Sequence, residues 1–257
     1  MGITGKAYYR YLYLKFSFIL DKRQYLQEKN DRKLRNEFYS GFIKKDDLVF
    51  DIGANEGNRV RPLLDLGAKI VAVEPQKECC ELLKYKYGNK INIIQKGVSS
   101  KVENRKLYIS EYSILSTFSK DWVEIIAPTR FNIDYIGEEL VEMTTLDELQ
   151  LKFGEPAFIK IDVEGFELEV LKGLNNMVKM LSIEYTLPEL DDDLNKCLHR
   201  LYYIDKEILI NYSVGESMIW AMATWLNYAD FLTHMKEDVF IQSGFGDVYI
   251  KRPEYLN

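Results

Sequence analysis

The chain has 257 residues, of which 47% are hydrophobic and 29% are charged, and its formal net charge is −6. This length can bury a sizeable core as one large domain. The acidic balance excludes the broadly basic surface that nonspecific nucleic-acid binding needs, so we expect no nucleic-acid partner. The cysteines Cys79, Cys80 and Cys197 lack metal-ligand spacing. They are typical of reduced thiols in a cytoplasmic protein.

The first 45 residues are expected to form a helical extension, and residues 46–257 the main domain. The most apolar stretch of the extension, residues 8–20, is interrupted by Arg10 and Lys15. It is therefore too short and too charged to cross a bilayer, and it lacks the small-residue cleavage site of a signal peptide. Its aromatic and basic residues suit peripheral contact with a membrane surface. We favour the alternative, a helix packed on the main domain.

From Leu48 onward, the pattern predicts alternating strands and helices. Seven strands are expected, at residues 48–52, 69–73, 91–95, 158–162, 180–185, 207–212 and 248–251. Helices are expected at residues 76–87, after Thr144 or Thr145, at 188–202 and at 217–236, and a β-rich excursion at 102–118. Such alternation is typical of an α/β fold with a mostly parallel sheet flanked by helices.

The first strand leads into a glycine loop with the residues Asp51, Gly53, Asn55 and Gly57. Gly53 and Gly57 permit a tight turn and let a ligand approach the backbone, and the amides at the start of the next helix suit an anionic group. Glu74 ends the second strand, and its carboxylate can accept both hydroxyl hydrogens of a ribose. An ordinary strand-to-helix turn and an acid that stabilises a helix terminus are the simpler alternatives.

The spacing of the glycines indicates which nucleotide binds. Dinucleotide-binding enzymes carry G-x-G-x-x-G, in which the glycines make room for a pyrophosphate. Gly53 and Gly57 give G-x-x-x-G instead. This spacing favours a nucleoside without a pyrophosphate, such as S-adenosylmethionine. A nicotinamide-dependent oxidoreductase is therefore the less favoured alternative.

A second strand-to-helix junction is rich in acids, because the apolar run 158–161 is followed by Asp162, Glu164 and Glu167. In open α/β sheets, ligands bind outside the carboxyl ends of the strands, so these carboxylates are candidates for chemistry. Acids in the first turn of a helix also stabilise it without any further function. Glu184 ends the next strand and would lie beside Asp162 if the strands are neighbours. The two could then hold a divalent metal ion, although none is expected.

These stretches together resemble the FkbM family of S-adenosylmethionine-dependent methyltransferases. The resemblance extends over residues 46–186, and the matching stretches are 49–57, 73–75, 145–147 and 159–165. It implies a Rossmann-like class I methyltransferase fold, S-adenosylmethionine as cofactor, and O-methylation of a saccharide or related small molecule, with glycan biosynthesis as a setting. Many members carry His after the last matching glycine, whereas this chain has Phe166. A histidine base at this position is therefore excluded.

The resemblance assigns roles to particular residues. Asp162 is the predicted base of the methyl transfer, and Lys160 and Glu164 belong to the same catalytic stretch. Val98 and Ser99 follow the third strand, where this fold presents backbone to an adenine ring. The complete predicted cofactor site is Asp51, Gly53, Asn55, Gly57, Glu74, Pro75, Val98, Ser99 and Asp162.

The predicted acceptor site comprises Ser116, Thr117, Glu184 and Trp220. Trp220, with Tyr212 and Trp225, could stack on a sugar face, although core packing is the commoner fate of large aromatic residues. A noncatalytic nucleotide-binding module that acts through partners is the remaining alternative. The sequence gives neither the identity of the acceptor nor the oligomeric state. Both histidines are expected to be structural, His199 and His234.

Overall fold

The computed structural model describes residues 7–12, 22–187 and 191–253. It divides the chain into two compact units, Met1–Lys96 (unit 1) and Gly97–Asn257 (unit 2). The predicted extension therefore belongs to the same unit as the first strands. Of its apolar stretch, residues 13–20 lie outside the described residues. Within the described part of the chain, no helix combines the length and the apolar character that a membrane crossing requires.

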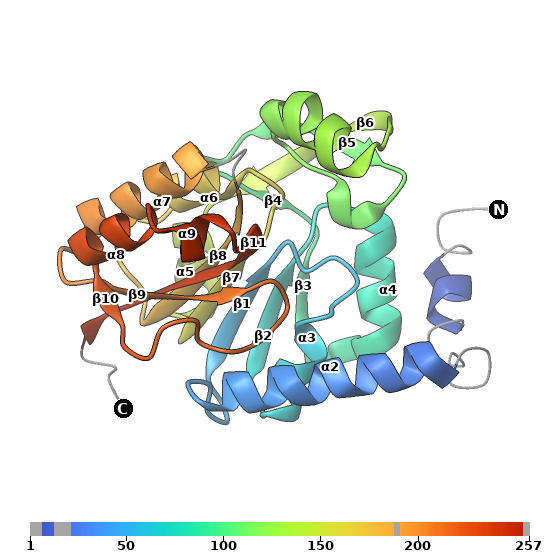
Figure 1. Cartoon of the computed structure of the whole chain (residues 1–257). Helices are drawn as coiled ribbons and strands as arrows, with labels where there is room; N and C mark the ends of the chain where they lie inside the picture. Colours follow the sequence, from blue (N-terminus) through green and yellow to red (C-terminus); the bar gives the residue numbers. More distant parts are fainter. Residues whose placement is uncertain (1–6, 13–21, 188–190, 254–257) are drawn as a thin grey trace. The chain divides into compact units, whose positions relative to one another are not determined.

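Unit 1 is built on the parallel strands β1 (Leu48–Ile52), β2 (Lys69–Val73) and β3 (Asn92–Ile94) (Figure 1). β2 lies between β1 and β3 and pairs with both. β1 and β2 are buried along nearly their whole length, as is usual for parallel strands that are covered on both faces. Their carboxyl ends meet at one edge, where Ile52 precedes the glycine loop and Val73 precedes Glu74.

The helices of unit 1 alternate with these strands. They are α2 (Lys22–Ser40), α3 (Val60–Asp65) and α4 (Lys77–Tyr87), with a short 3-10 helix, η1, at Gly88–Lys90. α3 follows β1 and α4 follows β2, as the sequence predicts. One face of α4 is buried and carries Cys79, Cys80, Leu82, Leu83 and Tyr87.

The described part of the extension packs on unit 1. Residues 7–12 are helical, and the Arg10 guanidinium forms an ion pair with Glu56 of the glycine loop at 3.0 Å. On α2, Arg32 forms an ion pair with Asp65 of α3 at 2.5 Å. For these residues, the favoured interpretation of a helix packed on the main domain therefore agrees with the structure.

Unit 2 contains strands in the order β10-β9-β11-β8-β7. β7 and β8 are parallel, whereas β11 lies between β8 and β9 and is antiparallel to both. The predicted last pair is therefore β9 with β11, and the two-residue β10 is added at the edge. The predicted α/β class, with mostly parallel strands and flanking helices, is confirmed. The bounds are β7 Phe158–Ile161, β8 Met180–Thr186, β9 Leu209–Val214, β10 Leu226–Asn227 and β11 Phe245–Lys251.

The two faces of β7 and β8 differ in chemistry. Side chains alternate between the faces of a strand, and the register pairs Lys160 with Ser182. One face therefore carries Lys160 and Ser182 and continues with Asp162, just after β7, and with Glu184. The sequence predicts that Glu184 ends its strand, but β8 extends to Thr186. The other face carries the buried apolar residues Ile159, Ile161, Leu181 and Ile183.

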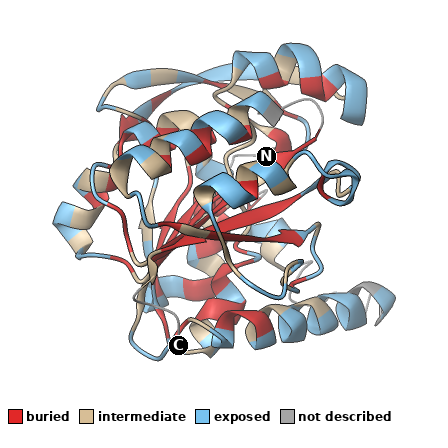
Figure 2. Cartoon of the chain, turned by 60° about the vertical axis from the view of Figure 1, so that its left-hand side comes forward, coloured by how far each residue is buried: buried red, intermediate tan, exposed pale blue. Residues whose placement is uncertain are grey.

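The helices of unit 2 cover its strands. They are α5 (Leu146–Phe153), α6 (Glu167–Lys172), α7 (Asp191–Ile204), α8 (Tyr228–His234) and α9 (Asp238–Ile241). As predicted, Thr145 caps α5, and its side chain accepts a hydrogen bond from the amide of Glu148. Residues 188–190, where the sequence places the start of the helix after β8, lie outside the described residues. Figure 2 shows the strands as mostly buried and the helices as buried on one side.

The helix predicted at residues 217–236 is wrong over its first half, because α8 begins only at residue 228. Asn227 caps α8, its side chain accepting a hydrogen bond from the amide of Asp230 at 3.0 Å. Upstream, Met218 has a φ of 52°, which an α-helix does not accommodate. The Asn211 side chain binds both the amide and the carbonyl of Met222. The segment thus satisfies backbone groups without forming a helix.

Residues 104–144 of unit 2 form an insertion before α5 (Figure 1, green). The sequence predicts β5 there, but neither β6 nor the π-helix η3. β6 escapes prediction because residues 136–140 are all exposed and so lack the alternation of a half-buried strand. A π-helix is rare and gives no distinct sequence pattern. The elements are β4 (Gly97–Val98) just before the insertion, then β5 (Asn104–Ser110), η2 (Ser113–Leu115), η3 (Trp122–Phe131) and β6 (Tyr135–Thr144).

Candidate cofactor loop and acidic cluster

The glycine loop of unit 1 starts where β1 ends. The amides of Gly53 and Ala54 donate to the carbonyl of Val73 at 2.9 and 3.1 Å, which closes the turn against β2. Gly53, Asn55 and Gly57 have φ values of 81°, 45° and 83°. Such left-handed values favour glycine and, among other residues, asparagine. The turn therefore explains why these residue types occupy it.

Packing also requires a glycine at position 57. A Cβ atom on Gly57 would lie 2.6 Å from Leu83 Cδ2 and 2.9 Å from Tyr87 Cε2, both on α4. The Tyr87 hydroxyl donates to the carbonyl of Gly57 at 3.0 Å. The loop is thus fixed to α4 at a separation that only glycine permits.

Glu74 is buried at the end of β2, with 2% of its surface exposed. One carboxylate oxygen accepts a hydrogen bond from the amide of Asn55 and the other from the amide of Gln76, both at 2.8 Å. Burial raises the pKa of Glu74 to about 7, and the two backbone hydrogen bonds oppose that rise. The Gln76 side chain also hydrogen-bonds to this carboxylate, so a ribose hydroxyl would use the remaining lone pair or replace the Gln76 side chain.

The other cofactor residues predicted in unit 1 lie beside this turn in the chain. Asp51 is buried on β1, and Pro75 is half-buried between Glu74 and the start of α4. Unit 1 thus joins the strand ends, the glycine loop and Glu74 into one hydrogen-bonded turn.

In unit 2, the chain after β7 forms a turn of unusual conformation. Glu164 and Gly165 have φ values of 55° and 81°. A left-handed conformation costs a residue other than glycine roughly 1–2 kcal/mol, so it persists only where other contacts hold it. The Glu167 carboxylate accepts from the amide of Val163 at 3.1 Å, and the Thr117 hydroxyl donates to the carbonyl of Glu164 at 2.7 Å. These two bonds hold the turn.

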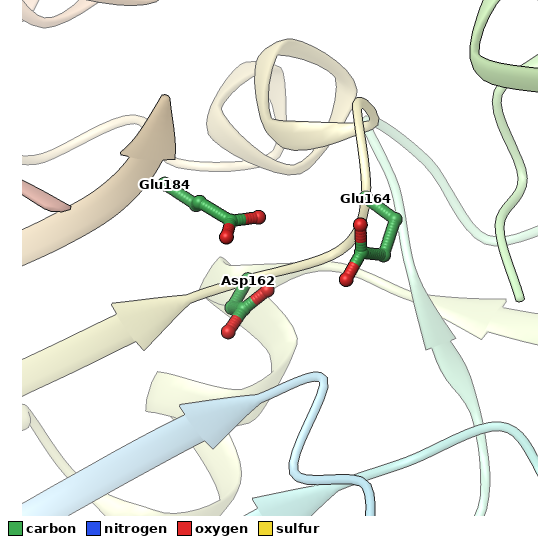
Figure 3. A group of neighbouring side chains, drawn as sticks. All are labelled: Asp162, Glu164 and Glu184. Carbon is green, nitrogen blue, oxygen red and sulfur yellow. The ribbon is translucent and has the colours of Figure 1, made fainter. Parts of the chain in front are cut away.

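The turn points the Glu164 side chain toward Asp162 and Glu184 (Figure 3). One carboxylate oxygen of each residue lies within 4.8 Å of the other two, and we call these residues the acidic cluster. Buried Lys160 forms an ion pair with Asp162. No group in the described part of the chain donates a hydrogen bond to the carboxylate of Glu164 or of Glu184.

Burial raises the pKa of both Glu164 and Glu184 well above the ordinary value, and repulsion from Asp162 adds to the rise. Lys160 opposes the rise at both residues. Burial likewise raises the pKa of Glu167 to about 7. Closely spaced carboxylates repel one another when they ionise, so the three residues titrate as a coupled unit. A group of this kind is suited to accept a proton during a reaction.

The adenine contacts predicted in unit 2 are both buried. Val98 ends β4, and the amide of Ser99 donates to the carbonyl of Thr144 on β6 at 2.8 Å. The Ser99 hydroxyl is buried and has no hydrogen-bond partner among the described residues.

The predicted acceptor residues of the insertion make hydrogen bonds within unit 2. The Ser116 hydroxyl accepts from the amide of Ser110 at 3.1 Å. The Thr117 hydroxyl donates to the turn at Glu164 and accepts from the amide of Ser119 at 2.8 Å. Both hydroxyls therefore take part in hydrogen bonds within the protein.

Trp220 lies half-buried in the irregular segment before α8. Its ring packs edge-on against Tyr249, with centroids 4.9 Å apart, and lies 5.0 Å from the ring of Trp225. Tyr212 is different, because it is buried and packs against Phe240 in the core. Tyr212 is thus a core residue and not part of a surface for stacking on a sugar.

Phe166 and His234 both have structural contacts. Phe166 is buried and packs against Phe118, with ring centroids 5.6 Å apart. The His234 ring makes hydrogen bonds with the side chains of Glu237 at 2.9 Å and Tyr212 at 3.2 Å.

Sequence reasoning misses the two bonds that hold the acidic turn. The sequence indicates only that Glu167 is an acid in the first turn of a helix, whereas in the structure its carboxylate accepts a hydrogen bond from the amide of Val163. The capping-box pattern does not mark this bond, because Glu167 is the first residue of α6 and the N-cap is Phe166. Thr117 is 47 positions from Glu164, and no pattern in the sequence connects the two.

Parallel strands with a glycine loop and a strand-terminal glutamate define an α/β nucleoside-binding domain. The chain matches the model of the Methyltransferase FkbM domain over residues 51–207. That match covers more than half of the chain, so the protein belongs to the FkbM family of methyltransferases. The resemblance noted in the sequence is confirmed, and the protein is a methyltransferase that uses S-adenosylmethionine.

Similar solved structures are remote in sequence. Precorrin-6y C5,15-methyltransferase from Geobacter metallireducens is 11% identical with a TM-score of 0.42, covering 85% of this chain and 84% of that one. A TehB-like SAM-dependent methyltransferase from Corynebacterium glutamicum is 8% identical with a TM-score of 0.46, covering 85% and 87%. The plantazolicin methyltransferase BpumL, in complex with SAH, is 12% identical with a TM-score of 0.41, covering 97% and 99%. No curated protein matches the chain.

Proposed function

We propose that the protein methylates a hydroxyl oxygen of a saccharide or related small molecule. The observation that carries the proposal is the acidic cluster, in which Glu164 and Glu184 have raised pKa values beside Asp162. A hydroxyl must lose its proton when its oxygen is methylated, and a carboxylate of high proton affinity can accept it. If the acceptor atom carried no proton to lose, the reaction would not need a proton-accepting cluster.

We assign the cofactor to the glycine loop and Glu74. These residues fit it, because Glu74 is a buried carboxylate at the end of β2 that can accept from a ribose hydroxyl, and Gly53 and Gly57 give the loop its tight turn. S-adenosylmethionine, when bound, supplies a methyl group that its sulfonium activates for displacement. Ionised Glu74 would hold the ribose hydroxyls through charge-assisted hydrogen bonds. In unit 1 we also assign Asp51, Asn55 and Pro75 to the cofactor, whereas Val98, Ser99 and Asp162 of unit 2 stay predictions.

We assign the chemical step to the cluster of unit 2. The ion pair with buried Lys160 fixes the orientation of the Asp162 carboxylate. The acceptor proton passes to the Asp162 carboxylate, and Glu164 and Glu184 beside it, whose pKa values burial and carboxylate repulsion raise, favour its uptake. The remaining task is alignment of the acceptor, which can lower a barrier by roughly 7–11 kcal/mol.

A divalent cation is the alternative occupant of the cluster. Mg²⁺ and Mn²⁺ favour oxygen ligands, and a bound cation would lower the pKa of an acceptor hydroxyl directly. Lys160 already supplies a positive charge to Asp162, which favours the metal-free form. Activity that survives EDTA supports the carboxylate base. Activity that EDTA abolishes and Mg²⁺ or Mn²⁺ restores supports the cation.

The saccharide class of the acceptor is supported by Glu184 and Trp220, two of the residues predicted to hold it. A sugar presents C–H faces that pack on aromatic rings and hydroxyls that pair with carboxylates. Trp220 is half-buried, so part of its ring is accessible for such packing. The acidic balance of the chain disfavours a polyanionic acceptor such as nucleic acid.

The experiment is a methyl-transfer screen with labelled cofactor against sugar nucleotides, oligosaccharides, peptides, RNA and small phenols. We expect labelled carbohydrate, and we expect Trp220→Ala to weaken acceptor binding more than cofactor binding. Tyr203→Ala, which removes an exposed ring on α7, is the matched control. Labelling of peptide or RNA while every carbohydrate stays blank contradicts the saccharide assignment. Tight binding of S-adenosylhomocysteine with no labelled product at all supports the noncatalytic alternative.

We further propose a cytoplasmic location and a transferase domain at residues 46–257. All three cysteines are free and buried, as expected of reduced thiols. The helix at residues 7–12 contacts that domain through the ion pair of Arg10 with Glu56.

A further inference from the structure

We propose that Thr117 is a positioning residue for the acidic cluster. Its hydroxyl holds the carbonyl of Glu164 and thereby keeps the Glu164 carboxylate facing Asp162 and Glu184. The inference rests on the proposed role of the cluster in the chemical step. It assigns the Thr117 hydroxyl to the chain itself, whereas the sequence placed that hydroxyl in the acceptor site.

The acidic turn needs to be held, for two reasons. Glu164 has a φ of 55°, a conformation that residues other than glycine adopt at a cost and that clusters at functional sites. Its carboxylate also faces Asp162 and Glu184 at short range and receives no hydrogen bond from the described residues. Both the backbone strain and the charge repulsion favour rotation of Glu164 away from its neighbours. The structure opposes this rotation at two points, Thr117 and Glu167.

Thr117 is itself firmly fixed. Only 1% of its surface is exposed, and its backbone makes a reciprocal pair of hydrogen bonds with Tyr108 of β5, at 2.9 and 3.2 Å. Its hydroxyl oxygen accepts from the amide of Ser119 at 2.8 Å. A threonine hydroxyl has one hydrogen, and the carbonyl of Glu164 takes it at 2.7 Å. No hydroxyl hydrogen is therefore left to donate to an acceptor molecule.

Two further contacts join the insertion to the chain just after Glu164. Phe118, which follows Thr117, packs against Phe166 at 5.6 Å between ring centroids. The Arg105 guanidinium of β5 lies 4.8 Å from the centroid of the Phe166 ring. The insertion thus contacts the turn at Glu164, through the Thr117 hydrogen bond, and the next residue after the turn, Phe166, through Phe118 and Arg105. The position of the insertion is therefore coupled to the direction of the Glu164 side chain.

The first test is hydrogen exchange in the full chain, which needs no acceptor. Thr117→Val removes the hydroxyl at nearly constant shape, and Thr117→Ser keeps it. We expect amide exchange at residues 162–167 to rise roughly two- to tenfold in Thr117→Val, which corresponds to the loss of one hydrogen bond. Thr117→Ser should match the wild type. The control is Thr129→Val, which removes a hydroxyl bonded to the carbonyl of Ile125 at 2.7 Å within η3.

The second test is kinetic, with the carbohydrate that is labelled most strongly in the screen. We expect Thr117→Val to lower kcat roughly 10- to 100-fold through misplacement of Glu164, with the KM for S-adenosylmethionine changed less than about twofold. Thr117→Ser should restore kcat. In a Glu164→Gln background, Thr117→Val should change kcat less than about twofold, because the two residues act as one unit.

Several results overturn the proposal. They are unchanged exchange at residues 162–167 in Thr117→Val, an equal loss of kcat in both backgrounds, or an effect confined to the KM of the carbohydrate. The last result would return Thr117 to the acceptor site. A normal melting temperature must accompany each variant, and Thr117→Ala, which also removes the hydroxyl, replaces Thr117→Val if that variant does not fold. Normal turnover by Glu164→Gln would instead refute the proposed role of the cluster, and the exchange data would still decide whether Thr117 holds the turn.

Discussion

The acidic strand ends of the two units differ in how their carboxylates are satisfied. In unit 1, Glu74 accepts two backbone amides at 2.8 Å. In unit 2, the carboxylates of Glu164 and Glu184 receive no hydrogen bond from the described residues and face other acids instead. Burial raises the pKa at both places, so burial alone does not distinguish them.

The difference indicates two kinds of task. A carboxylate that amides hold on both oxygens is fixed in position and suits recognition of a ribose. Carboxylates that receive no hydrogen bond from the described residues, such as those of Glu164 and Glu184, have a high proton affinity and suit proton transfer or a cation. Both places rely on a left-handed residue other than glycine, Asn55 in one and Glu164 in the other. In unit 1 the residue type fits that conformation, whereas in unit 2 other contacts must hold it.

The largest effect is expected at Asp162. Asp162→Asn keeps the shape but removes the basic carboxylate, so turnover should fall by roughly 10²–10⁴ while cofactor affinity changes little. Single-turnover methyl transfer and calorimetry measure the two quantities. Asp205→Asn changes an acid that pairs with Arg252 at 3.4 Å and serves as the control. Normal turnover by Asp162→Asn would remove this residue from the mechanism.

Glu74→Ala should have the next largest effect. It removes two proposed charge-assisted hydrogen bonds to the ribose, each contributing roughly 1.5–3 kcal/mol, so affinity for S-adenosylmethionine should fall at least about tenfold. Glu78→Ala, which changes an exposed acid in the first turn of α4, is the matched control for calorimetry. An unchanged dissociation constant in Glu74→Ala would show that Glu74 does not hold the ribose.

A pair of glycines separates packing from conformation in unit 1. Both Gly57 and Gly88 have positive φ values, but only at Gly57 would a Cβ meet atoms within 3 Å. Gly88→Ala should cost only the strain of the conformation, roughly 1–2 kcal/mol in the free energy of unfolding. Gly57→Ala should cost roughly 1–3 kcal/mol more because of the clash with α4. Denaturant unfolding measures both, and equal losses would mean that α4 moves away freely.

The smallest expected effect is the pH dependence of cofactor binding. Burial raises the pKa of Glu74 to about 7, and the ionised form is the better acceptor for ribose hydroxyls. Affinity for S-adenosylhomocysteine should therefore tighten as the pH rises from 6 to 8, and Glu74→Gln should abolish that trend. Without ligand, the sign is opposite. The raised pKa stabilises the folded chain at low pH, and this contribution is lost as the pH rises from 4.5 through 7.

Most of unit 1 could be predicted from sequence because its geometry demands particular residue types. Positive φ values at Gly53 and Gly57 select glycine, and the buried parallel strand before them gives an unbroken apolar run. The sequence predicts where the acidic turn lies but not its backbone conformation, because glutamate is not a residue type that favours a positive φ. Its contact with Thr117 joins residues 47 positions apart. Residues 217–227 misled the prediction because the side chain of Asn211 binds their backbone across the fold.

The division of tasks between the two strand ends is tested most directly by one calorimetric comparison. Glu74→Gln and Glu164→Gln make the same chemical change at a glutamate with a raised pKa, one in each unit. Titration with S-adenosylhomocysteine at pH 8 needs no acceptor. We predict that Glu74→Gln weakens binding at least about tenfold and that Glu164→Gln stays within about twofold of the wild type. Equal losses in both variants, or a larger loss in Glu164→Gln, would contradict the account.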